Sequence, residues 1–141
     1  MLRAARLLAR PALGRLHAVQ SMQSMLRPRH CITVHFMKQG EDGTTTVAAK
    51  SGQTILEVAH EHDIDIEGAC GGECACSTCH VLLEPEAYSK LPEPDDDEAD
   101  MLDLAMNVTD TSRLGCQVKL EKARDDGLRV TIPAGVVNVL S

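Results

Sequence analysis

Hydrophobic and polar residues alternate along the first regular segment of the chain. Apolar residues occupy every second position from Ile32 to Phe36, and polar residues lie between them. A period of two places one set of side chains on one face of a strand, so we predict a half-buried strand over 32–38. The polar, glycine-containing segment 39–43 predicts a turn. Residues 44–49 then complete a β-hairpin.

The spacing changes to a helical one after this hairpin. Thr54 and Glu57 stand three positions apart, the spacing at which each side chain bonds to the other residue's backbone N–H at the start of a helix. Ile55, Val58 and Ala59 recur at helical spacing, so we expect them to face the core.

No periodicity extends over residues 66–79, which contain three glycines, two alanines and four cysteines. This composition predicts a loop. A short apolar run over 80–83 predicts a strand, and 85–94, which lies between prolines, is expected to be irregular.

A second helix is predicted over 95–107. Its expected inner face is apolar and comprises Met101, Leu104, Ala105 and Val108, while Asp96, Asp100 and Asp103 fall on the opposite face. Segments 117–120 and 128–132 are predicted to be closing strands around a turn at 125–127. Strands, a packed helix and further strands define an α+β domain.

Composition divides the chain of 141 residues into two unlike parts. Residues 1–30 contain six arginines and no acid, interleaved with leucine and alanine, which is typical of a mitochondrial transit peptide. We therefore expect a transit peptide over 1–30 and one functional domain over 31–141 in the mitochondrial matrix. A basic arm without a targeting role is the alternative. Arginines interrupt every apolar run of this segment, so no membrane span is expected there.

The remaining part of the chain is strongly acidic. It holds eight basic residues against all 21 acidic ones, a formal charge of −13. Such a domain repels nucleic acid and attracts basic protein surfaces. We expect protein partners and no nucleic acid.

Four of the six cysteines fall within the ten residues from Cys70 to Cys79. This crowding indicates a metal centre rather than a disulfide scaffold. Cys70, Cys76 and Cys79 on one loop, with Cys116 farther along, supply four thiolates. Two irons bridged by two sulfides need four terminal ligands, and thiolate is the soft ligand that iron–sulfur clusters take.

Four sequence blocks resemble the adrenodoxin-like family of 2Fe–2S ferredoxins. They are Gly68-Ala69-Cys70, Cys76-Ser77-Thr78-Cys79-His80, residues 100–105 and Ser112-Arg113-Leu114-Gly115-Cys116-Gln117. The five-residue gap between the first two cysteines differs from the four-residue gap of plant-type ferredoxins. The resemblance covers about residues 32–133 and implies a β-grasp fold, with a mixed sheet, a packed helix, a cluster-binding loop and an acidic interaction helix.

The resemblance also implies a function. The chain is expected to be a monomeric one-electron carrier, not an enzyme, that accepts electrons from a NADPH-dependent flavoprotein ferredoxin reductase. The expected acceptor is the mitochondrial iron–sulfur assembly machinery, and the alternative is a haem mono-oxygenase. A four-cysteine zinc-binding interaction module is an alternative of another class, although structural zinc usually takes two short Cys-x-x-Cys pairs.

Further residues receive roles from the same resemblance. Those implied to dock basic partners are the acids Asp96, Asp97, Glu98, Asp100 and Asp103. His80 is expected to tether the loop to the later segment through Glu98 or Ser112, and Arg113 to pair with Glu98. Cys74, inside the loop, is interpreted as a small packed side chain rather than a ligand.

Overall fold

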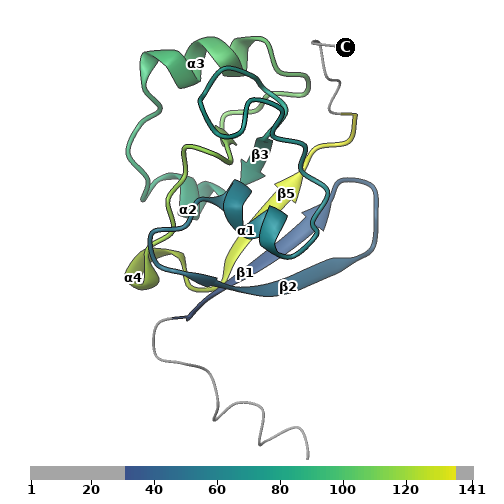
Figure 1. Ribbon diagram of the computed structural model, residues 1–141, viewed down its shortest axis with the longest axis vertical. Helices are drawn as coiled ribbons and strands as arrows, with labels where there is room; N and C mark the ends of the chain where they lie inside the picture. Colours follow the sequence, from purple (N-terminus) through teal and green to yellow (C-terminus); the bar gives the residue numbers. More distant parts are fainter. Residues whose placement is uncertain (1–30, 136–141) are drawn as a thin grey trace, which may run out of the picture.

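The structure, a computed structural model, describes residues 31–135 and is built around one mixed sheet (Figure 1). The strands are β1 (Cys31–Lys38), β2 (Thr44–Lys50), β3 (His80–Leu83), β4 (Ser112–Leu114) and β5 (Leu128–Ile132), and the helices are α1 (Ile55–Glu61), α2 (Pro85–Tyr88), α3 (Asp96–Asp103) and α4 (Lys122–Asp125). The sheet order is β2-β1-β5-β3-β4. Only β1 and β5 pair in parallel; the other pairs are antiparallel. The predicted α+β class and β-grasp sheet are confirmed.

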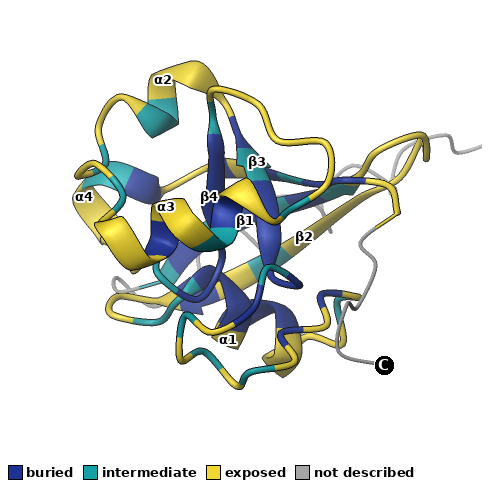
Figure 2. Cartoon of the chain, turned by 90° about the horizontal axis from the view of Figure 1, so that it is seen from above, coloured by how far each residue is buried: buried dark blue, intermediate teal, exposed yellow. Residues whose placement is uncertain are grey.

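The predicted hairpin and first helix are present. Ile32, Val34 and Phe36 are buried along β1, as the alternation predicts. Helix α1 begins with the predicted reciprocal cap, because Thr54 accepts from the backbone N–H of Glu57 and Glu57 accepts from that of Thr54. Figure 2 shows the buried parts of α1 and of the strands meeting in the interior. None of the helices in the described range is long and apolar enough to cross a membrane.

Two segments outside the second predicted helix differ from the prediction. Segment 85–94 is not wholly irregular, because Pro85 starts the short helix α2 with its ring at the first helical position. Segment 117–120 is not a strand of the sheet. Its buried residue Leu120 exchanges backbone hydrogen bonds of 2.8 Å with Gly52 and Gln53, at the entry to α1. The last sheet partner of β3 is β4 instead.

The second predicted helix is shorter than expected, and its inner face was predicted only in part: Met101 packs against the core as expected. Helix α3 ends at Asp103, and its buried residues are Glu98 and Leu102. Leu104 and Val108 are exposed. The last turn of α3 contains acidic residues and no base, and negative charge at this end is unfavourable because the helix dipole is itself negative there. Farther along, Asn107 takes a left-handed φ of 59°, which is incompatible with a continuing helix.

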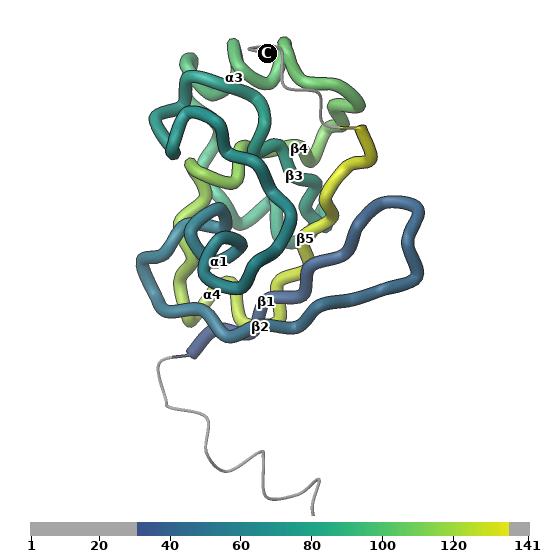
Figure 3. Tube along the Cα trace, turned by 45° about the vertical axis from the view of Figure 1, so that its right-hand side comes forward, coloured from purple at the N-terminus to yellow at the C-terminus, as the bar shows by residue number. Residues whose placement is uncertain are grey.

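The loop that joins α1 to β3 lies at the same end of the molecule as α3. Figures 1 and 3 both show this loop, in teal, beside the helix. The loop therefore brings its cysteines to the end of the sheet where β3 starts and β4 finishes.

Candidate metal centre

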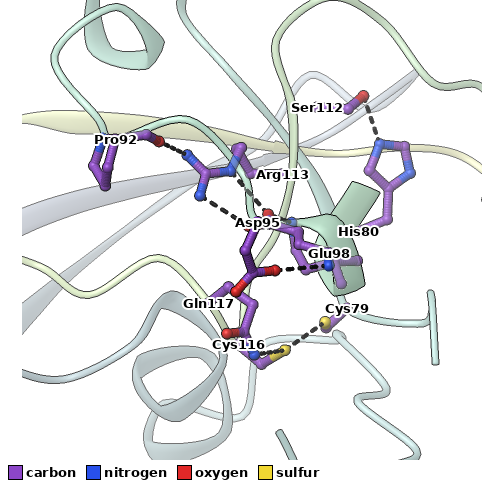
Figure 4. Close-up of polar contacts among 10 residues, drawn as sticks. Cys79, His80, Pro92, Asp95, Glu98, Ser112, Arg113, Cys116 and Gln117 are labelled. Carbon is purple, nitrogen blue, oxygen red and sulfur yellow. Dashed lines mark hydrogen bonds and ion pairs between the residues drawn. The ribbon is translucent and has the colours of Figure 1, made fainter. Parts of the chain in front are cut away.

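The structure brings Cys79, the last predicted ligand of the loop, next to the distant Cys116. Their Sγ atoms lie 3.5 Å apart (Figure 4). The backbone supports this approach, because Gly115 N–H donates to the carbonyl of Cys79 at 2.8 Å. Both thiols are buried. The pair thus joins the end of the loop to the residues that follow β4.

Cys70 and Cys76 form the second pair. The backbone N–H of Cys70 donates to Cys76 Sγ at 3.3 Å, and the two side chains also interact by a hydrogen bond. The four predicted ligands therefore lie as two pairs of thiols. Two thiolates for each of two irons is the terminal ligand set of a 2Fe–2S cluster, so the donor set fits this group.

A mononuclear zinc centre fits less well. A structural zinc ion needs four ligands around one position. Within residues 31–135, no three His, Cys, Asp or Glu side chains are gathered closely enough to hold one metal ion. Pairs of thiols spread over a loop instead suit a cluster in which sulfide bridges fill the remaining positions.

Hydrogen bonds to sulfur set the charge distribution at the site. A hydrogen bond from Cys79 lowers the pKa of Cys116 to about 6, and Gln117 Nε2, at 3.3 Å, contributes in the same direction. The same bond and burial raise the pKa of Cys79. Burial opposes ionisation of Cys70, but its pKa is lowered because backbone N–H groups of the loop and the Cys76 thiol stabilise its thiolate. Of the four predicted ligands, Cys70 and Cys116 thus have a pKa shifted toward the thiolate form.

Two glycines allow the close approaches that the site requires. A Cβ atom on Gly115 would lie 3.0 Å from the carbonyl oxygen of Cys79. Gly68, at a left-handed φ of 58°, is covered by the side chain of Leu56, whose nearest atom would lie 2.7 Å from an added Cβ. At Gly68 and Gly115 the surrounding atoms therefore leave no room for a larger side chain without a shift of the neighbouring atoms.

Cys74 lies inside the same loop in a left-handed conformation, with φ of 55°. Its half-buried side chain packs against the core, and its backbone N–H stabilises the thiolate of Cys116. Burial, followed by the Cys116 thiol and the acids Asp95, Glu98 and Asp97, raises the pKa of Cys74 to about 11. A neutral, packed side chain agrees with the predicted role.

His80 and Ser112 tether the loop to β4. His80 Nε2 lies 2.8 Å from Ser112 Oγ, and both residues are buried. Burial lowers the pKa of His80 against the effect of a hydrogen bond to the backbone of Met106. Of the two expected tethers, the structure contains the one through Ser112. Glu98 is held by Arg113, which confirms the predicted pairing of these two residues.

Glu98 departs from the predicted docking set. Its side chain is 2% exposed and pairs with Arg113, so it cannot contact a partner protein. The other four predicted acids are exposed: Asp96, Asp97, Asp100 and Asp103. The docking role that the resemblance implied is wrong for Glu98, whereas its predicted pairing with Arg113 is confirmed. The buried guanidinium of Arg113 offsets the cost of burying the carboxylate.

Two residues that contact ligand sulfurs were absent from the predicted site. Thr78 Oγ1 lies 3.1 Å from Cys76 Sγ and accepts from the backbone N–H of Ala69. Gln117 contacts Cys116. The signal that could have found them is their position beside the ligands, within the sequence blocks shared with the family.

The sheet, the loop and the two pairs of thiols define a class, the β-grasp proteins that bind a binuclear iron–sulfur cluster. The model of the 2Fe-2S iron-sulfur cluster binding domain matches residues 37–121, so the chain belongs to this family. Within it the chain is an adrenodoxin-like 2Fe–2S ferredoxin, an electron carrier and not an enzyme.

Curated relatives occur in mitochondria and in bacteria. The mitochondrial adrenodoxin homolog of Saccharomyces cerevisiae is 55% identical over 103 residues, which cover 73% of this chain and 58% of that protein. The 2Fe-2S ferredoxin of Rickettsia prowazekii is 51% identical over 108 residues, covering 77% of this chain and 95% of the relative. The chain thus matches little more than half of the yeast protein and nearly all of the bacterial one.

Solved structures share the fold. A ferredoxin from Rhodopseudomonas palustris has a TM-score of 0.69 and 34% identity, covering 74% of this chain and 99% of its own. An ISC-like 2Fe-2S ferredoxin from Pseudomonas putida has a TM-score of 0.66 and 39% identity, covering 78% and 99%. A covalent putidaredoxin reductase–putidaredoxin complex contains a further match, with a TM-score of 0.65 and 29% identity over 71% and 96%.

Proposed function

We propose that this ferredoxin accepts single electrons from a NADPH-dependent flavoprotein reductase and delivers them to the iron–sulfur cluster assembly machinery of mitochondria. The observation that carries the proposal is the exposed acidic face of α3 beside a loop built to hold a 2Fe–2S cluster. A carrier needs both a redox centre and a surface that basic partners recognise.

The cluster, when bound, supplies one reversible one-electron site. The proposed ligands are Cys70, Cys76, Cys79 and Cys116. Backbone N–H groups of the loop and the side chain of Gln117 donate to the thiolates and stabilise negative charge. Burial of Cys76, Cys79 and Cys116 restricts access of water. These features of the chain help to set the potential and keep the centre intact.

The acids of α3 provide the recognition. Asp96, Asp97, Asp100 and Asp103 are exposed on one short helix, and residues 31–141 carry a formal charge of −13. Opposite charges steer protein association and lose effect as salt rises. One of the similar solved structures is a covalent complex of putidaredoxin with putidaredoxin reductase, which supports a flavoprotein reductase as the donor.

The assembly machinery is the favoured acceptor. An ISC-like ferredoxin is 39% identical to this chain, whereas putidaredoxin is 28% identical. A haem mono-oxygenase is the second candidate. The mitochondrial location is supported by the yeast and Arabidopsis thaliana relatives, which are named mitochondrial. The proposed transit peptide over 1–30 lies outside the described residues.

Reconstitution tests this function. Purified protein should be brown, and the reductase with NADPH should bleach its visible absorption. The reduced ferredoxin should then support cluster formation on an assembly scaffold and give little turnover of a mitochondrial mono-oxygenase. A colourless protein with one bound zinc ion would contradict the carrier function, whereas turnover of the mono-oxygenase alone would reverse the choice of acceptor.

A further inference from the structure

All the exposed large hydrophobic side chains of the described residues belong to one short segment. Leu104 is 65% exposed, Met106 57% and Val108 45%. They follow directly after the acidic helix α3, so they lie within five residues of one another and next to Asp103. Scattered exposed apolar residues are ordinary, but their concentration in one place indicates an interaction site.

The backbone of this segment is held in place. The backbone of Met106 is hydrogen-bonded to His80, which also contacts Ser112. Asn107 has a left-handed φ of 59°, and its side-chain amide donates to the carbonyl of Ala134 at 3.1 Å. A fixed backbone presents the three side chains without a large loss of conformational entropy on binding.

The surroundings specify the chemistry of the partner. Asp100 and Asp103 are exposed at the end of α3, immediately before the apolar segment. Protein interfaces commonly have an apolar centre surrounded by a polar rim, and methionine is enriched in them. An apolar centre with acids along the side formed by α3 fits a protein whose own apolar patch is bordered by lysine and arginine.

We propose that Leu104, Met106 and Val108, here called the apolar segment, form the centre of the docking surface for the basic electron-transfer partner, with the acids of α3 as its rim. This inference rests on the proposed carrier function and adds a division of labour to it. The acids accelerate association, whereas burial of the apolar segment slows dissociation and so sets most of the affinity.

The test compares three variants of the holoprotein with an NADPH-dependent flavoprotein ferredoxin reductase as the probe. The apolar variant is Leu104→Ser/Met106→Ser/Val108→Ser, the charge variant is Asp100→Asn/Asp103→Asn, and the control is Thr44→Ser/Thr45→Ser on exposed positions of β2. Kd and both rate constants are measured by stopped flow at several salt concentrations. Visible spectra verify that each variant holds its cluster.

The apolar variant should raise Kd about tenfold, mainly through faster dissociation, and leave the slope of affinity against salt unchanged. The charge variant should lower the association rate and flatten that slope. The control should match the wild type. A second readout, the KM for ferredoxin in reductase-coupled reduction of cytochrome c, should follow Kd.

Several results would overturn the inference. One is an apolar variant whose Kd stays within twofold of the wild type while electron transfer remains normal. Another is a loss of thermal stability without a change in Kd, which would show that the chain covers the apolar segment itself. A wild-type dimer that dissociates in the apolar variant would identify a second copy as the occupant. If the wild type accepts no electrons from the reductase, the proposed carrier function fails first.

Discussion

Arg113 and Glu98 form a buried, bidentate ion pair that joins the acidic helix to the strand leading to Cys116. Arg113 Nε donates to Glu98 Oε1 at 2.8 Å, and Nη2 donates to Oε2 at 2.9 Å (Figure 4). Arg113 Nη1 also bonds to the carbonyl of Pro92, and Glu98 Oε1 accepts from the backbone N–H of Leu114. The acidic helix is therefore tied to the strand that ends two residues before the proposed ligand Cys116.

Glu98→Gln should destabilise the protein strongly. The substitution keeps the shape of the side chain but leaves the guanidinium of Arg113 buried without a counter-charge, at a cost of about 3 kcal/mol or more. For a domain of this size, we expect the midpoint temperature for loss of visible absorption to fall by roughly 12 °C or more. The matched control is Asp97→Asn, which removes an exposed acid from the same helix and should leave the midpoint nearly unchanged. Equal effects of the two variants would contradict a structural role for the pair.

Two neighbouring cysteines should differ in whether the cluster requires them. Cys76→Ala removes a proposed ligand whose Sγ accepts from the backbone N–H of Cys70, and it should abolish the visible spectrum and the bound iron. Cys74→Ala should retain both, because the backbone N–H that stabilises Cys116 remains and alanine adds no backbone strain beyond that of cysteine at the same φ. Iron and sulfide analysis with electron paramagnetic resonance measures the outcome. A normal cluster in Cys76→Ala would refute the ligand set.

Gly115→Ala should weaken the backbone contact between Gly115 and Cys79, which holds the end of the loop next to Cys116. The added Cβ would meet the carbonyl oxygen of Cys79 at 3.0 Å, in a place where backbone must move to make room. Overpacking of this kind costs about 1–3 kcal/mol. We expect a smaller fraction of purified protein with cluster and a lower midpoint temperature. Gly43→Ala is the control, since its Cβ would meet nothing within 4 Å; a similar loss there would contradict the steric explanation.

The sequence predicted the parts of this protein that depend on local pattern or on spacing. Alternation identified β1, and the Thr54–Glu57 cap identified the start of α1. The cysteine spacing led to four thiols that the structure brings together as pairs. In each case the prediction depends on a pattern within a few residues or on a sequence block that resembles the family.

The two main failures have different causes. Periodicity assigned Leu104 and Val108 to a buried face, but the helix stops at Asp103 and leaves both exposed. Glu98 was assigned to the docking surface by the resemblance, and its pairing with Arg113, 15 residues away, was predicted without the consequence that the pair is buried. The burial of Glu98 depends on a partner distant in sequence, which a pattern within one element does not contain, whereas the exposure of Leu104 and Val108 depends on where the helix ends.

Asp126 should make the stability of the domain depend on acid pH. Hydrogen bonds from Lys122 Nζ at 2.7 Å and from the backbone N–H of Thr33 at 2.9 Å hold the pKa of its carboxyl below the usual value of 3.8. A carboxylate with a lowered pKa stabilises the fold above the unfolded value and loses this effect as pH falls through the folded value. Because the pair is exposed, the contribution is less than about 1 kcal/mol.

Asp126→Asn should therefore be less stable than the wild type at pH 7, and the difference should shrink below about pH 4. Urea unfolding of both proteins at each pH measures the difference in their free energy of unfolding. Any effect of acid on the cluster is common to the two proteins and does not enter the difference. Lys122→Gln removes the stronger hydrogen bond and should reproduce most of the difference. If the difference in the free energy of unfolding between the wild type and Asp126→Asn grew toward low pH, it would have the wrong sign for this explanation.

Asp100 and Asp103 should control the salt dependence of electron transfer. Both are exposed at the end of α3, so Asn substitutions remove charge without disturbing a buried contact. We expect Asp100→Asn/Asp103→Asn to raise the KM for ferredoxin in reductase-coupled reduction of cytochrome c by roughly fivefold at low ionic strength, with little effect at high ionic strength where screening removes the attraction. Asp42→Asn, in the turn between β1 and β2, is the control, because it removes one exposed negative charge away from α3. If Asp42→Asn raised the KM as much per charge removed, the effect would come from net charge, and α3 would not be the docking face.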